Sequence, residues 1–456
     1  MHRIILLALL GACDPWKTPE PGPETLPTSG VLDSGASDID TDTDSDTDTD
    51  SDTDTDTDTD TDTGATGDTG QGCVPLEPVD VATPDPRVQV SGVPPIDGMA
   101  ADLAELGAVF LQSADEGTNT AVSPVSLSGL LTLMALDAQP PLSVQLDGVF
   151  GSDDLLPWTA TFSAYTADTQ APPAVRHGVV QHARALFYGP TPGEPWLTRA
   201  TDQGVHLEGL DFAKDAEAAR GVINEWVGEG TACMIPELLP SGALDAAQVV
   251  LVDALSMAAD WVTEFPDEVD QPFTLADATT VDLTTAVGIT NVDRSIVGEA
   301  EVITLPTKDP TLSLRIVLPT EPTTADDLLA SLDGPTLSSW MAAGTPESVT
   351  LYLPLLDLGT SIDLVDRFGD LGLQSLPDNP AWGSLCPTCA AVGAARQKVV
   401  VQVGAKGLRA AAATYASGVS SAPPELRVDR PFLFVVSDEA AQVPWFVGIV
   451  RDPRAP

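Results

Sequence analysis

The chain has 456 residues, and its 68 acidic against 20 basic side chains give a formal charge of −48 at neutral pH. This acidic excess excludes a nucleic-acid-binding protein, because binding phosphates requires patches of lysine and arginine. There is also no Gly-x-Ser-x-Gly motif, no paired-histidine metal motif and no phosphate-binding glycine loop. We therefore predict a protein that is not an enzyme, with no cofactor and no metal site formed by its four histidines, His2, His177, His182 and His206.

Residues 1–12 read as an export signal. Arg3 is followed by the seven apolar residues Ile4–Leu10 and then by Gly11-Ala12-Cys13, so that the stretch ends in Leu10-Gly11-Ala12-Cys13. It is too short for a permanent membrane span. The last four residues resemble a bacterial lipoprotein box, which implies cleavage before Cys13 and lipidation of its thiol. An ordinary secretory signal is the alternative. Either way we expect export. The lipoprotein box, which we favour, implies in addition a lipid anchor at the cell envelope or cell surface, on the extracellular or periplasmic side.

Residues 13–92 are rich in Pro, Thr, Ser, Asp and Gly and read as a tether. Aspartate occupies every second position from Asp38 to Asp62. Such a tract repels itself and has no apolar surface to bury, so we expect it to be disordered and extended. At about 3.3 Å per residue it could reach roughly 80 Å. Calcium binding is the alternative, although the tract lacks the glycine turn and terminal glutamate of an EF-hand loop.

Residues 93–456 carry the folded domain. Met99–Gln112 has apolar residues at helical spacing, and Leu127–Leu136 reads as a buried helix by the same test. Short apolar strands separated by turns follow, which together with the early helices predicts an α+β fold. The predicted strands are Val180–Phe187, Thr311–Leu318, Val349–Leu353, Lys398–Val403, Phe432–Val436 and Trp445–Val450.

The cysteines of an exported chain are candidates for disulfides. Cys386 and Cys389 are three positions apart, as in a redox motif, but no strand opening into a helix precedes them. A small structural disulfide in a loop is therefore favoured over redox or metal use. Cys73 and Cys233 could form a second pair, which the sequence does not settle.

The segment Gly407–Ser421 is made almost wholly of small residues. In a strand, alternate side chains point to opposite faces, so Leu408, Ala410, Ala412 and Thr414 would share one face without a charge, and Arg409 would lie on the other. Alanine and glycine are nevertheless poor strand formers. The pattern indicates a segment that can enter a sheet but is weakly committed to one. An alanine-rich linker or short helix is the alternative.

Four segments taken together resemble the serpin family in the right order: Asn119–Ser126, Ile223–Val227, Leu251–Leu255 and Val428–Phe434. The resemblance covers residues 96–456. It implies a serpin fold, with three β-sheets, about nine helices and an exposed reactive-centre loop.

The same resemblance implies a serine protease inhibitor that acts as a suicide substrate. A target protease would cleave the loop, and the cut loop would insert into the central sheet and trap the acyl-enzyme. Counting along the loop places the cleaved bond after Ser420 or after Ser421, before Ala422. Small residues there suit elastase-like or subtilisin-like serine proteases. The inhibitor is expected to be monomeric and to touch the membrane only through its lipid anchor.

The family also implies roles for two sets of residues. Ser123, Ser126, Asp253 and Gln397 correspond to a hydrogen-bonded shutter beneath the central sheet. Asp253 and Gln397 stand where the family has Asn and His, and a hydrogen bond between them would compensate for both changes. The hinge of the loop comprises Gly407, Leu408, Arg409, Ala410, Ala411, Ala412, Ala413 and Thr414.

Two hinge positions depart from the family pattern. Ala405 replaces the usual Glu, and Leu408 stands where Thr or Ser is usual. A bulky first residue costs about 1–3 kcal/mol if it overpacks the sheet. The alternative function is accordingly a non-inhibitory surface binding protein on the same fold, cleaved without trapping its protease.

Overall fold

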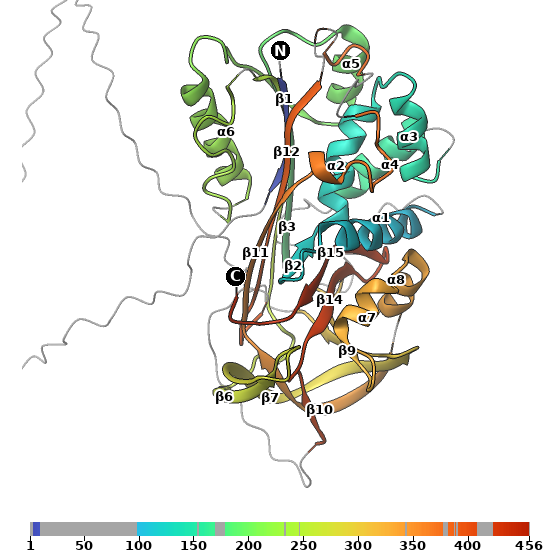
Figure 1. The fold of residues 1–456 in the computed structure, drawn as a ribbon, viewed down its shortest axis with the longest axis vertical. Helices are drawn as coiled ribbons and strands as arrows, with labels where there is room; N and C mark the ends of the chain where they lie inside the picture. Colours follow the sequence, from blue (N-terminus) through green and yellow to red (C-terminus); the bar gives the residue numbers. More distant parts are fainter. Residues whose placement is uncertain are drawn as a thin grey trace, which may run out of the picture. The chain divides into compact units, whose positions relative to one another are not determined.

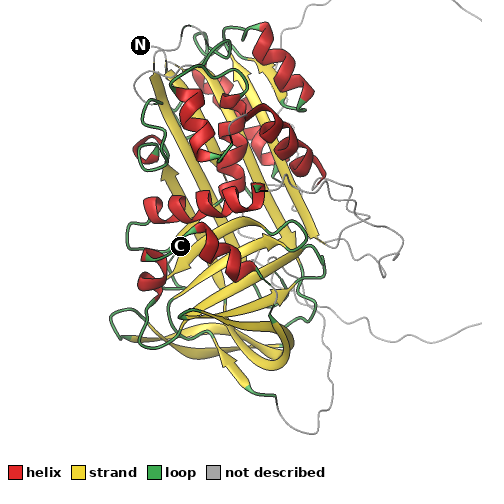
Figure 2. Ribbon diagram, turned by 90° about the vertical axis from the view of Figure 1, so that its right-hand side faces the viewer, coloured by secondary structure: helices red, strands yellow, loops and turns green. Residues whose placement is uncertain are grey.

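A computed structural model of the chain describes residues 3–9, 98–152, 155–168, 178–231, 234–245, 247–342, 344–376, 382–386, 388, 391–407 and 423–455. Structural statements below concern these residues. The fold is α+β, as predicted, with helices gathered around a central sheet and a second body built mostly from strands (Figures 1 and 2).

The central sheet has the strand order β11-β12-β1-β5-β3-β4. Its two longest members, β5 and β12, have 13 residues each. The prediction for Val180–Phe187 and for Lys398–Val403 is confirmed, although both strands begin earlier than the apolar pattern suggests. The strands are β1 (Arg3–Leu9), β3 (Gly178–Tyr188), β4 (His206–Gly209), β5 (Ala247–Ala259), β11 (Leu356–Asp363) and β12 (Ala391–Val403).

The remaining strands form one hydrogen-bonded path, β13-β10-β7-β8-β9-β14-β15-β2, with β6 added beside β7. The 18 residues of β7 pair first with β6 and β10 and at their end with β8. This long strand divides the path into two sheets, which with the central sheet makes three. Their strands are β2 (Thr120–Val122), β6 (Asp267–Thr274), β7 (Thr280–Val297), β8 (Ala300–Pro306), β9 (Leu312–Pro319), β10 (Thr345–Pro354), β13 (Glu425–Arg427), β14 (Phe432–Asp438) and β15 (Val443–Val450).

Helices cover both faces of the central sheet. In Figure 1, α6 lies on one side and α2 to α5 on the other. The predicted helices from Met99 and around Leu127–Leu136 are confirmed as α1 and α2. The described helices are α1 (Met99–Ala114), α2 (Pro124–Ala135), α3 (Leu142–Val149), α4 (Leu155–Asp168), α5 (Glu194–Asp202), α6 (Ala216–Gly230), α7 (Ala325–Ala330), α8 (Gly334–Met341) and the 3₁₀ helix η2 (Val365–Arg367).

Local sequence explains where several helices begin. Ser123 caps α2 by accepting a hydrogen bond from the Ser126 N–H at 3.1 Å, and Pro124 follows at the first helical position, where its missing N–H costs nothing. Every residue of α2 is buried. A helix that is buried on every side is a core helix, and α2 packs against β5 of the central sheet.

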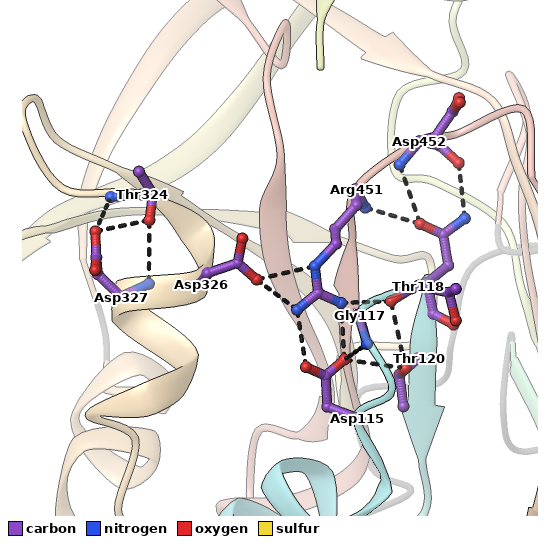
Figure 3. A network of polar contacts seen from close by, with 10 residues as sticks. Asp115, Gly117, Thr118, Thr120, Thr324, Asp326, Asp327, Arg451 and Asp452 are labelled. Carbon is purple, nitrogen blue, oxygen red and sulfur yellow. Dashed lines mark hydrogen bonds and ion pairs between the residues drawn. The ribbon is translucent and has the colours of Figure 1, made fainter. Parts of the chain in front are cut away.

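Arg451, just after β15, ties the end of the fold to its beginning (Figure 3). Its guanidinium donates to both carboxylate oxygens of Asp115, at 2.7 and 2.9 Å, and also to Asp326 at the start of α7. Its backbone N–H donates to Asn119 Oδ1 at 2.7 Å. Burial alone would lower the pKa of Arg451, but the hydrogen bonds to Asp115 and Asp326 raise it above its usual value. The charged form is therefore held in place.

Candidate functional site

A tight turn at Gly404–Gly407 lies between β12 and the loop. The Gly404 N–H donates to the Gly407 carbonyl at 2.9 Å. The fully buried Trp261 holds the turn twice, because its backbone N–H donates to the Lys406 carbonyl at 2.8 Å and its indole Nε1 donates to the Gly404 carbonyl at 2.9 Å. The segment that leads into the loop is thus fixed to the chain that follows β5.

Gly407 fills a position that admits no side chain. A Cβ there would lie 2.4 Å from the Ala259 carbonyl oxygen and 2.7 Å from Asp260 Cα. Backbone atoms cannot yield as a flexible side chain can. Gly407 also forms an antiparallel bridge with Asp260. The first residue of the predicted hinge therefore touches the end of β5 as well as the end of β12.

The two pairings of Gly407 define the register that the hinge would take if it entered the sheet. If the antiparallel pairing of Gly404 with Gly407 continues, Ala412 falls opposite Val399; if the bridge to Asp260 continues, Ala412 falls opposite Leu255. Both Val399 and Leu255 are fully buried. By the same rule Thr414 of an inserted loop would fall between Gln397 and Asp253. The two registers agree, although Leu408–Thr414 themselves lie outside the described residues, as do Ser420, Ser421 and Ala422.

The predicted shutter residues come together in part. The Gln397 amide makes two hydrogen bonds to the backbone of Ser123, since its Oε1 accepts from the Ser123 N–H and its Nε2 donates to the Ser123 carbonyl, each at 3.0 Å. Ser126 joins them through the cap of α2. All three residues are buried. This cluster ties β12 to the start of α2.

Asp253 lies at the same level but is not bonded to Gln397, which corrects our expectation. Asp253 and Gln397 are both register partners of Ala8, so β1 lies between their strands. Two strand spacings amount to about 9.6 Å, too far for a hydrogen bond. Asp253 instead pairs in register with Arg184 on β3. Burial lowers the pKa of Arg184, and the nearby charge of Asp253 opposes that effect.

The far end of the loop is anchored separately. Residues Glu425–Arg427 form β13 beside β10. The Arg427 guanidinium lies over the Tyr352 ring, 3.7 Å from its centroid, and Nη1 donates to Gln271 Oε1 at 2.7 Å. A hydrogen bond from Arg427 to Glu425 raises the pKa of the arginine. Our sequence reasoning missed this contact, because the pairing of Arg427 with Tyr352 depends on a register that no local pattern shows.

Replacing Trp261 with phenylalanine should loosen the turn before the loop. The change leaves the buried Gly404 carbonyl without its indole donor, which we expect to lower the free energy of unfolding by about 1–3 kcal/mol. Trp445→Phe is the matched control, because Trp445 is equally buried and its indole N–H has no hydrogen-bond partner in the described part of the chain. Urea unfolding of both variants measures the difference. Equal losses would contradict the role assigned to the indole hydrogen bond.

Cys386 is disulfide-bonded, consistent with the predicted loop disulfide; Cys389, its expected partner, lies outside the described residues. Asp137 anchors the adjoining segment by accepting from the Ser384 N–H at 2.7 Å and from its hydroxyl at 2.6 Å. Burial alone would raise the pKa of Asp137, but hydrogen bonds from Ser384 and Arg199 hold it below its usual value. The ionised form of Asp137 therefore stabilises the fold.

This anchor should make stability depend on pH. Because the folded pKa of Asp137 is depressed, its contribution is complete above the unfolded value of about 3.9 and is lost as the pH falls through the folded pKa. We expect Asp137→Asn to be less stable than the unsubstituted chain at pH 7, and the difference to shrink below about pH 4. Urea unfolding from pH 7 to pH 3 checks this. A difference that stays constant over that range would refute the assignment.

Other predicted residues lie outside the described part of the chain: Cys13, the Asp38–Asp62 tract with its calcium alternative, Cys73 and Cys233. Among the described residues, no group of three histidines, cysteines or carboxylates is placed to hold a metal ion. In the same part of the chain, no helix is long and apolar enough to cross a membrane.

Comparisons with known proteins identify a family and several relatives of this chain. Residues 105–453 match the family described as "Serpin (serine protease inhibitor)". The chain is 32% identical over 288 residues to plasminogen activator inhibitor 1 of Bos taurus, covering 60% of this chain and 70% of that protein. It is 29% identical over 367 residues to leukocyte elastase inhibitor of Sus scrofa, covering 75% of this chain and 95% of that protein.

Solved structures show the same fold. The native state of the thermophilic serpin tengpin superposes with a TM-score of 0.69 at 19% identity, over 83% of this chain and 97% of tengpin. Human thyroxine-binding globulin in complex with its ligand superposes with a TM-score of 0.67 at 20% identity, over 78% of this chain and 98% of that protein. At these identities the likeness concerns the fold alone.

Proposed function

The chain belongs to the serpin family, and on this premise we propose that it inhibits serine proteases as a suicide substrate. A protease attacks the loop between Gly407 and Pro423, the acyl-enzyme forms, and the cut loop enters the central sheet as a new strand. The new strand could add about a dozen ladder hydrogen bonds, each contributing about 1 kcal/mol net. Their sum is comparable with the stability of an ordinary domain, which is sufficient to deform a captive protease.

One observation carries this proposal. Gly407 pairs with the end of β12 through Gly404 and with the end of β5 through Asp260, so the loop begins at the entrance between the two strands it would join. The register extended from these contacts turns Ala412 toward buried neighbours, in agreement with the uncharged face of the hinge. The relatives named as inhibitors, plasminogen activator inhibitor 1 and leukocyte elastase inhibitor, support the same function.

We assign the cleaved bond to the position after Ser420 or after Ser421. A small residue there suits a shallow specificity pocket, so the target class is an elastase-like or subtilisin-like serine protease. The test is incubation with pancreatic elastase or with subtilisin, followed by denaturing gel electrophoresis and mass spectrometry of the released peptide. We expect a complex that survives SDS and a cut at Ser420 or Ser421. Cleavage only after Arg409 or Arg427 would overturn the assignment of the bond.

Clean cleavage without a stable complex would instead favour a non-inhibitory binding protein on the serpin fold. Two residues point in that direction: Leu408, the first side chain to enter the sheet, and Ala405, which replaces an acidic residue usual in the family. We place inhibition first, because the residues that would face inward on insertion, Leu408, Ala410, Ala412 and Thr414, carry no charge.

The chain's location is a separate part of the proposal. We infer that cleavage before Cys13 and lipidation of its thiol anchor the mature protein, with residues 14–92 as spacer between the membrane and the serpin domain. In a bacterial host, Cys13→Ala should move the protein from the membrane fraction to the soluble exported fraction. Unchanged membrane association of that variant would exclude the lipid anchor.

A further inference from the structure

The apolar leader forms part of the central sheet. Residues 3–9, as β1, run parallel to both β5 and β12, and in the described strands β5 and β12 pair with β1 and not with each other. Figure 1 shows β1, in blue, alongside β12. The leader and the sheet also belong to the same compact unit of the chain.

The strand register shows which positions of the central sheet β1 occupies. Arg3 is level with Ala247 on one side and Ala391 on the other, and Ala8 is level with Asp253 and Gln397. The register carried forward from Gly407 puts Thr414 between Asp253 and Gln397, and Ser420 between Ala247 and Ala391. Arg3 and Ala8 therefore hold the levels that Ser420 and Thr414 would reach after insertion.

β1 pairs with only the first half of β5 and the first half of β12. β1 ends level with Ala254, so the second halves of β5 and β12, nearest to Gly407, remain for the start of the hinge. A cavity lined by Met257, Val400 and Val401 lies in this second half. The hinge can enter as far as Ala412. From Ala413 onward it meets the leader, because one strand position cannot hold two chains with complete ladders on both sides.

The leader's composition suits this position. Between Arg3 and Asp14 it carries no charged residue, and strands covered by helices on both faces are read as continuous apolar runs. The opposite direction of the two segments does not relieve the conflict, because β1 is parallel to its neighbours and the loop would be antiparallel, yet each needs the same backbone donors and acceptors.

We propose that the leader, while it remains attached, occupies the place of loop residues 413–420 in the central sheet and keeps the precursor from trapping proteases. The proposal rests on the inhibitory function proposed above. In the precursor a protease still cleaves the loop, but the cut loop cannot advance beyond Ala412 and the protease is released. Removal of residues 1–12 opens the position and makes the protein competent.

The backbone pairing is tested by Leu6→Pro in the full chain, produced in the cytosol so that the leader is retained. Leu6 is level with Leu251 and Ala395, and proline there removes the ladder donor. Leu6→Val, which keeps the N–H, is the matched control. Hydrogen exchange of residues 247–254 and 391–397 should be roughly tenfold faster in Leu6→Pro than in Leu6→Val. Equal exchange in the two variants would overturn the proposal.

Trapping is tested on the same proteins and on a chain that begins at Asp14, each mixed with subtilisin. We expect SDS-stable complexes from Leu6→Pro and from the shortened chain, and cleavage without complex from the full chain and Leu6→Val. If all four form complexes equally, inhibition stands and the blocking role of the leader fails. If none forms a complex but exchange differs as expected, the leader occupies the sheet and the proposed inhibitory function fails.

Discussion

Replacing Ala412 with glutamate is expected to abolish the SDS-stable protease complex while leaving the loop as easily cleaved as before. In the register set by Gly407, Ala412 inserts between Val399 and Leu255, both of which are fully buried. An uncompensated buried charge costs about 3–5 kcal/mol, and each 1.4 kcal/mol slows a step about tenfold. Insertion would then be slowed by about two to four orders of magnitude, and the protease would escape by completing hydrolysis.

Ala413→Glu provides the matched control, one position along the hinge. The same register places Ala413 opposite Lys398, which is partly exposed, and opposite charges on neighbouring strands attract each other. We expect this variant to keep most of its trapping. The measurement is the fraction of inhibitor found in complex and in cleaved form after reaction of the shortened chain with subtilisin. Equal trapping by the two variants would show that the face assigned to the hinge is wrong.

Replacing Gly129 with alanine is expected to lower the free energy of unfolding by about 3 kcal/mol. A Cβ at this position of α2 would lie 1.7 Å from Asp253 Oδ2 and 2.5 Å from its Cγ. Asp253 is fully buried in β5 and paired in register with Arg184, so its carboxylate has no solvent-facing position to retreat to. Helix and sheet would have to separate at the level of the shutter.

Two further variants make this prediction specific. Gly221 lies within α6, and a Cβ there would meet nothing within 4 Å, so Gly221→Ala should stabilise the chain by about 1 kcal/mol through helix propensity alone. Gly129→Ala should cost far less in the background of Asp253→Ala than in the unsubstituted chain, because the clashing carboxylate is gone; the loss of the charge that faces Arg184 is common to both chains of that comparison. Urea unfolding of these chains compares them. Similar effects of alanine at positions 129 and 221 would disprove the clash.

Elements with strong local patterns could be predicted from the sequence. The helix from Met99 and the strands around Lys398–Val403 and Phe432–Val436 follow from apolar spacing, because burial on one or both faces imposes that spacing directly. The family resemblance also predicts Gly407 at the start of the hinge. Its neighbours Ala259 and Asp260 explain why glycine is required there.

Pairings between distant residues could not be predicted in the same way. Gln397 was expected to bond Asp253 but bonds the backbone of Ser123, because a strand separates the two residues. Residues 1–12 are predicted to be an export signal, yet no local pattern indicates that residues 3–9 pair with β5 and β12. Such contacts are set by the register of strands more than 200 positions away, which composition and periodicity do not encode.

The hydrogen bonds of Arg451 limit how early the fold can be completed during synthesis. Its partner Asp115 is 336 positions earlier in the chain, and β2 depends on β15 for its pairing. The ribosome thus releases α1 and β2 long before their partners exist. Contacts of such sequence separation form slowly, and neither the Arg451–Asp115 contact nor the β2–β15 pairing can form until residues 447–451 have been synthesised.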